Sequence, residues 1–66
     1  MANAAYDIVE TEAERVERWR AEELERAGYG LSAAAMLAAS AGVDLHRAID
    51  LLHKGCTQDV AMQILL

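Results

Sequence analysis

The stretch GVDLHRAIDLLHKGCTQDVAMQILL, residues 42–66, decides how this chain is expected to fold. It twice contains a glycine, then an apolar residue, then a residue that commonly caps helices. With one earlier copy, this order occurs at Gly30-Leu31-Ser32, Gly42-Val43-Asp44 and Gly55-Cys56-Thr57. Glycine often ends a helix, and Ser, Asp and Thr often cap the next one. The order therefore predicts three helix boundaries, with Gly42 and Gly55 each ending a helix in the left-handed backbone region.

These boundaries divide the C-terminal part of the chain into three short helices. The predicted spans are about 33–40, 45–54 and 58–66. The apolar residue before each cap is expected to pack against the first turns of the helix that follows it. Three helices of this length are too few and too short for a repeat solenoid, so a compact bundle over residues 32–66 is expected.

A long acidic amphipathic helix is predicted before the bundle, over residues 5–27. The range lacks Gly and Pro, and apolar residues recur at helical spacing at Val9, Ala13, Val16, Leu24 and Ala27. The residues TEAE, Thr11–Glu14, match a capping box, so the helix begins either near Ala5 or at Thr11. Gly28 is expected to end it. Together these features predict an all-α fold in a single domain, residues 1–66.

Composition and charge narrow the functional classes. Hydrophobic residues make up 55% of the 66 residues, too many for a disordered chain, but so short a chain often gains stability by association. A net charge of −5 is opposite to that of most nucleic-acid binders. No stretch approaches the ~18 apolar residues of a membrane span, and the acidic N-terminus does not match a secretory leader. The lone Cys56 suits a reducing compartment, so a cytoplasmic protein is expected.

Residues 20–54 resemble the ubiquitin-associated (UBA) domain and its bacterial UBA-like relatives. The matching residues are Leu24-x-x-Ala27-Gly28-Tyr29, Ala34 and Ala48-Ile49-x-Leu51-Leu52. The family has a Met-Gly-Phe/Tyr loop after its first helix, small residues where helices cross, and a dileucine near the end of its third helix. Ala27 stands here where the family has methionine. The resemblance implies a UBA-like bundle and a partner surface made of Ala27, Gly28, Tyr29, Leu51 and Leu52. The Ala- and Arg-rich composition is also similar to short proteins of high-GC bacteria, where ubiquitin itself would not be the ligand.

Two further features point to a protein interface. Arg20 falls within the apolar stripe of the long helix. Either its stem lies along Leu24 and Trp19 with its head in water, or it makes an interface contact, since Arg and Trp are enriched in binding hot spots. The second helix, SAAAMLAAS, has few polar residues, so it packs either internally or against a second copy or larger partner. The predicted partner-binding residues are Val16, Trp19, Arg20, Ala27, Gly28, Tyr29, Met36, Leu51 and Leu52.

A metal site and an active site are weaker interpretations. His46, Asp50, His53 and Cys56 are ligand types spaced to share one helix face, which allows a metal-binding set. Alternatively, the first three form a solvated face and Cys56 packs as an apolar residue. Cys56 has no motif that would stabilise a thiolate, so no enzymatic activity and no cofactor are expected.

The sequence therefore favours a non-enzymatic protein–protein interaction module. It would either associate with a second copy or serve as an accessory subunit of a larger cytoplasmic assembly, with Trp19 and Tyr29 as aromatic anchors. One alternative is a small helix-turn-helix regulator that uses residues 44–54 or 57–66 for recognition. Those helices offer only Arg47 and Lys54 as fixed cations, which are few for reading DNA.

Overall fold

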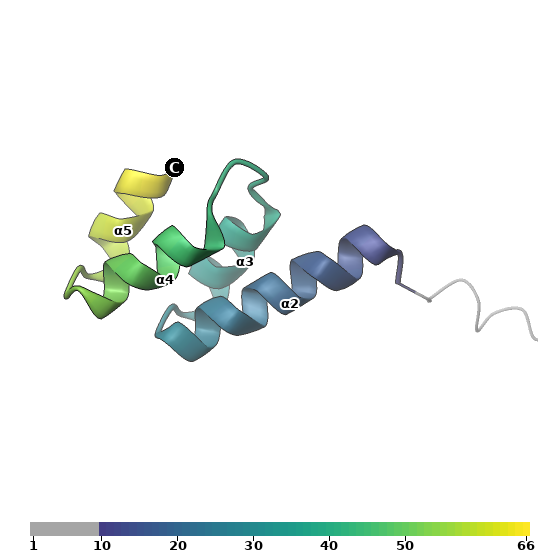
Figure 1. Ribbon diagram of the computed structural model, residues 1–66, viewed down its shortest axis with the longest axis horizontal. Helices are drawn as coiled ribbons and strands as arrows, with labels where there is room; N and C mark the ends of the chain where they lie inside the picture. Colours follow the sequence, from purple (N-terminus) through teal and green to yellow (C-terminus); the bar gives the residue numbers. More distant parts are fainter. Residues whose placement is uncertain (1–9) are drawn as a thin grey trace, which may run out of the picture.

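The computed structural model describes residues 10–66, and all regular structure in that range is α-helical (Figure 1). The helices are α2 (Glu12–Ala27), α3 (Leu31–Ala39), α4 (Leu45–His53) and α5 (Gln58–Leu65). The predicted all-α class is confirmed, with one longer helix followed by three short ones. None of these helices has the length and apolar character needed to cross a bilayer.

Helix α2 begins at the capping box. The Thr11 side chain accepts a hydrogen bond from the Glu14 N–H at 3.1 Å, and the Glu14 carboxylate accepts one from the Thr11 N–H at 2.9 Å. Of the two predicted starts, the observed one is therefore Thr11. The predicted extension over residues 5–9 lies outside the described residues, and Glu10 and Thr11 are not helical.

Glycine ends both α2 and α4 in the same way. Gly28 has φ +123° and Gly55 has φ +100°, conformations that residues with a side chain rarely adopt. The N–H of Tyr29 donates to the Leu24 carbonyl at 3.1 Å, and that of Cys56 donates to the Leu51 carbonyl at 3.0 Å. These are Schellman endings, in which the apolar residue after the glycine turns back onto the core. The predictions for Gly28 and Gly55 are thus confirmed.

Two predicted boundary features are wrong. Gly42 does not have a positive φ. Helix α3 ends instead at Ala39, and the hydroxyl of its C-cap residue, Ser40, donates to the Met36 carbonyl at 2.9 Å. Ser32 is not a cap, because α3 already begins at Leu31 and has Gly30 at its N-cap with no side-chain cap. Both ends of α3 are therefore set by interactions that the order of glycine, apolar residue and cap does not predict.

Long-range bonding explains the start of α3. The Gly30 N–H donates to the side-chain oxygen of Gln58, the first residue of α5, at 2.7 Å. The other two predicted caps are present as expected. The Asp44 carboxylate accepts from the N–H groups of His46 and Arg47, and the Thr57 hydroxyl accepts from Val60.

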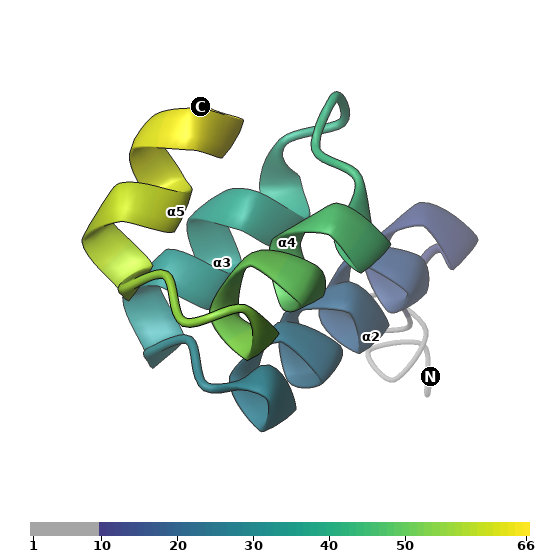
Figure 2. The ribbon, with the colours of Figure 1, turned by 60° about the vertical axis from the view of Figure 1, so that its left-hand side comes forward.

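The core is small and rich in alanine. Leu24 and Leu37 are its largest fully buried side chains. Within residues 10–66, five of the nine buried apolar residues are alanines; the nine are Leu24, Tyr29, Ala33, Ala34, Leu37, Ala38, Val43, Ala48 and Ala61. Helices α3 and α4 lie between α2 and α5 (Figure 2). Small side chains let these helices approach closely, but each buries little apolar area.

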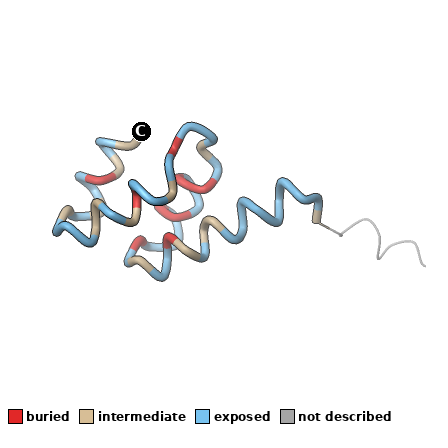
Figure 3. The backbone as a smooth tube through the Cα atoms, viewed as in Figure 1, coloured by how far each residue is buried: buried red, intermediate tan, exposed pale blue. Residues whose placement is uncertain are grey.

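The first half of α2 extends beyond the bundle of the other three helices. Every residue from Glu12 to Trp19 is exposed, and burial along the helix begins only at Arg20 and Ala21 (Figure 3). A helix normally buries its apolar stripe against a neighbouring element. Here, the two turns of α2 that carry Val16 and Trp19 leave these apolar side chains only partly buried.

The glycine at the end of α2 provides a stability test. A Cβ at Gly28 would lie 3.4 Å from Leu52 Cδ1 in a strained backbone conformation, whereas one at Gly42 would meet nothing within 4 Å. We expect Gly28→Ala to lower the free energy of unfolding by about 1–2 kcal/mol. Gly42→Ala should leave it unchanged to within about 0.5 kcal/mol or raise it. Urea unfolding followed by circular dichroism measures both, and equal losses would contradict this account of the helix end.

Candidate functional site

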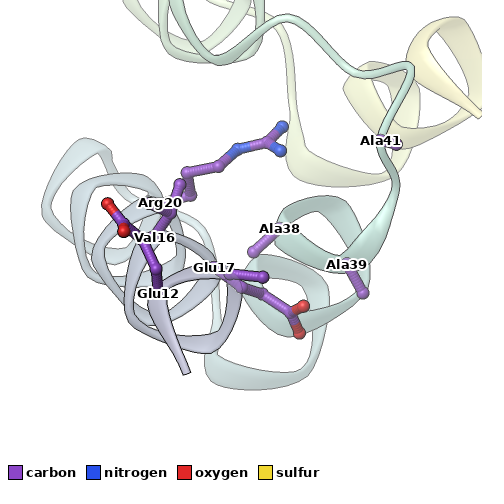
Figure 4. Close-up of a pocket in the computed structure, with 8 residues that line it drawn as sticks. Glu12, Val16, Glu17, Arg20, Ala38, Ala39 and Ala41 are labelled. Carbon is purple, nitrogen blue, oxygen red and sulfur yellow. The ribbon is translucent and has the colours of Figure 1, made fainter. Parts of the chain in front are cut away.

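A groove of about 340 Å³ lies between the first half of α2 and the end of α3 (Figure 4). Its lining residues are Glu12, Ala13, Val16, Glu17, Arg20, Ala38, Ala39 and Ala41. The side chains of Arg20 and Glu17 extend from α2 on either side of Ala38, while the Glu12 carboxylate points away from α3 (Figure 4). The groove thus has walls of small apolar side chains and a charged rim.

The local sequence accounts for this groove. Helix α3 ends in consecutive alanines, Ala38 and Ala39, and Ala41 continues the wall into the following segment. Alanine side chains are too short to fill the space beside the projecting half of α2. The sequence interpretation missed these three alanines, and it also missed Glu12 and Glu17. The run of small residues before Gly42 was the available indication, but it shows no preference for one side of the helix.

Arg20 connects the groove to the core. Its Nη2 atom donates to the Val43 carbonyl at 2.7 Å in a partly buried position. This hydrogen bond joins α2 to the segment between α3 and α4, which also contains Ala41. Neither of the two alternatives for Arg20 included this hydrogen bond to a backbone carbonyl of the same chain. Since a guanidinium has several N–H donors, others remain available for a second contact.

Two large apolar side chains lie near Arg20 on the exposed half of α2. Val16 is 48% exposed and lines the groove, and Trp19 is 53% exposed one turn further along. Met36, a third predicted contact residue, is 53% exposed on α3. A tryptophan left half in water offers a large apolar area to a partner. The predicted residues Val16, Trp19 and Arg20 thus lie on one surface of α2. We call this surface, together with Glu12, the α2 face.

The surface implied by the UBA resemblance is only partly assembled. Gly28 lies close to Leu52, and Leu51 and Leu52 are half-buried against the core. Tyr29, however, is only 3% exposed, and its hydroxyl donates to the Ala48 carbonyl at 2.7 Å. The expectation that Tyr29 is a surface anchor is therefore not met. Its ring instead fixes the loop after α2 against α4.

The alternative metal set is not brought together. Within residues 10–66, no three His, Cys, Asp or Glu side chains lie close enough to hold a metal ion. His46, Asp50 and His53 are exposed on α4, and Asp50 forms an ion pair with Lys54 at 2.7 Å. Cys56 is half-buried and packs against the core. This arrangement corresponds to the alternative of a solvated helix face followed by an apolar packing residue.

Comparison with known proteins adds no named relative. The chain matches no protein-family model, no curated protein and no solved structure. The candidate site therefore depends on the exposed side chains and the groove of this chain itself.

The Arg20 hydrogen bond predicts a stability loss. Arg20→Met keeps most of the aliphatic stem and removes the donor to the Val43 carbonyl, so the free energy of unfolding should fall by about 1–2 kcal/mol. Arg15→Met on the exposed side of the same helix should cost less than about 0.5 kcal/mol. Denaturant titration of dilute protein measures the difference. If both variants lose the same stability, the Arg20 bond does not hold α2 to the bundle.

Burial raises the pKa of the Tyr29 hydroxyl above its ordinary value of 10.0, and the charge of Cys56 adds to the shift. The unfolded chain ionises this group near pH 10, while the folded chain keeps the proton to higher pH. The stability that depends on protonated Tyr29 is therefore present below pH 10 and is lost as the pH rises through the folded-state pKa. In a Tyr6→Phe background, absorbance titration should show ionisation above pH 10. Ionisation at or below pH 10 would contradict the burial of this hydroxyl.

Proposed function

We propose that this protein is a non-enzymatic protein–protein interaction module that binds through the α2 face and its adjoining groove. The observation that carries the proposal is that every residue of Glu12–Trp19 is exposed, including a half-exposed valine and the only tryptophan of the chain. Tryptophan and arginine are the residue types most often found at the energetic centre of interfaces. Trp19, Val16 and Arg20 supply these contacts side by side.

The physical need for a partner supports the same proposal. A chain of 66 residues buries a smaller fraction of its surface than larger domains do, and the alanine-rich core makes its stabilisation smaller still. A helix seated on the α2 face would cover Val16 and Trp19. The alanines of the groove wall would let its backbone come close. Such association would bury apolar surface that the bundle alone leaves exposed.

The partner is either a second copy or a subunit of a larger assembly in the cytoplasm. The groove is lined by two glutamates and one arginine, a charge balance that suits a protein surface better than a phosphate backbone. The UBA resemblance stays a prediction, and the proximity of Gly28 to the Leu52 side chain is the part of the structure that supports it.

Val16 can be tested against a matched control. Val16→Ser and Val60→Ser remove equivalent side chains of nearly equal exposure, 48% and 46%, from α2 and from α5. Residues that cost more than about 1 kcal/mol when truncated cluster at the centre of an interface, and Val16 lies at the centre of the proposed one, so Val16→Ser should weaken association about tenfold. Val60→Ser should leave it unchanged.

Light scattering and the emission of Trp19 over a dilution series would measure self-association, and retention from cell extract would detect other partners. Because Trp19 is the single tryptophan, its emission should shift to shorter wavelength as the α2 face becomes covered. A chain that stays monomeric at micromolar concentration and retains no protein would refute the proposed function. If the two serine variants weaken association equally, the α2 face is not the interface.

A further inference from the structure

The exposed half of α2 is complementary to itself when its direction is reversed. Residues 12–20 read EAERVERWR, and Val16 is their centre. Residues equidistant from Val16 have opposite charge in three cases: Glu12 with Arg20, Glu14 with Arg18, and Arg15 with Glu17. The remaining pair, Ala13 with Trp19, combines a small side chain with a large one.

We infer that the partner of the α2 face is a second copy of this chain, with the two α2 helices antiparallel and related by a two-fold axis at Val16. The inference rests on the proposed function and identifies the partner that binds the α2 face. Glu12, Val16 and Arg20 are spaced four apart, so they form one row on the helix surface. All three line the groove. In the antiparallel pair, each Glu12 lies level with Arg20 of the second copy, on either side of the two valines.

Both charged groups of this row have capacity for such a contact. Within residues 10–66, Glu12 forms no salt bridge, and its carboxylate points away from α3 (Figure 4). Arg20 is held in place by the Val43 carbonyl, 2.7 Å from Nη2, and retains other N–H donors. A side chain that is already ordered loses less conformational entropy on binding. The Glu12–Arg20 contact would occur twice in the dimer, once on each side of the axis.

Net charge also favours this part of the surface. The whole chain carries −5, so two copies repel each other in general. Residues 12–20 contain three glutamates and three arginines, which makes this stretch neutral. Two copies that meet here avoid the repulsion that the acidic remainder of the chain would produce.

A parallel pairing would have the opposite electrostatic outcome. It would place Glu12 beside Glu12 and Arg20 beside Arg20, and like charges at such distances are unfavourable. It would also bring the two Trp19 side chains to one level while leaving the two Ala13 positions empty. Reversal of one helix removes both problems.

The groove allows the second helix to come close. Ala38, Ala39 and Ala41 form its far wall, so a helix on the α2 face also meets small side chains at the end of α3. Packed helices approach to about 8–10 Å between axes when the contacting side chains permit it. Both copies would present the same surface, as a two-fold interface requires.

Cross-linking of the full chain tests the geometry. In a Cys56→Ala background, Val16→Cys places the single thiol at the two-fold axis, and Ala13→Cys places it one turn away. At a rise of about 1.5 Å per residue, the two Ala13 positions would lie ~9 Å apart along an antiparallel pair. A disulfide needs Cα atoms within about 7 Å. Under mild oxidation, Val16→Cys should form a covalent dimer and Ala13→Cys should not.

A charge variant gives a second, independent readout. Glu12→Arg converts both Glu12–Arg20 contacts into repulsion and should weaken dimerisation at least about tenfold. Glu25→Arg, an equal charge change at an exposed position in the other half of α2, should leave dimerisation unchanged. Circular dichroism would verify that both variants remain helical.

The outcomes separate this inference from the proposed function. Cross-linking of both cysteine variants, or of neither, would overturn the antiparallel dimer, as would equal effects of the two arginine variants. A chain that dimerises without a Val16 cross-link, or that stays monomeric and binds a different protein through Val16, would still be an interaction module. Only a chain that stays monomeric and binds no other protein would refute both the antiparallel dimer and the proposed function.

Discussion

Alanine sets the size of this bundle, and most other features of the structure follow from it. In the described part of the chain, five of the nine buried apolar residues are alanines, so the helices lie close together around Leu24 and Leu37. A core packed this closely covers only the second half of α2. The first half extends beyond it, and the alanines at the end of α3 leave the space beside it unfilled. The thin core and the candidate interface thus have one physical cause.

The helix ends that the sequence predicts correctly are those set by local chemistry. The capping box at Thr11, the caps at Asp44 and Thr57, and the left-handed Gly55 each involve residues within one turn of each other. The start of α3 was predicted wrongly because its bonding partner, Gln58, is 28 residues away. Local patterns contain no information about such a contact.

The same distinction holds for the candidate site. Helical periodicity alone places Val16 and Arg20 in one stripe of α2, with Trp19 on its flank. Tyr29 could not be placed in the core, because its hydrogen-bond acceptor is the carbonyl of Ala48 on another helix. The groove alanines were missed for a related reason. Nearly every residue of α3 is apolar, so periodicity does not show which of them face α2.

Arg20 makes the interface depend on the fold. The hydrogen bond to Val43 fixes the guanidinium, and it also holds the segment that carries Ala41 at the groove wall. Any partner that uses Arg20 therefore meets a surface whose two walls are already joined. A different protein that binds here must present much the same pattern as a second copy: an acidic group for Arg20, a basic group for Glu12, and an apolar residue between them. Self-association and binding of another protein would consequently compete for one surface, and protein concentration would decide which of them prevails.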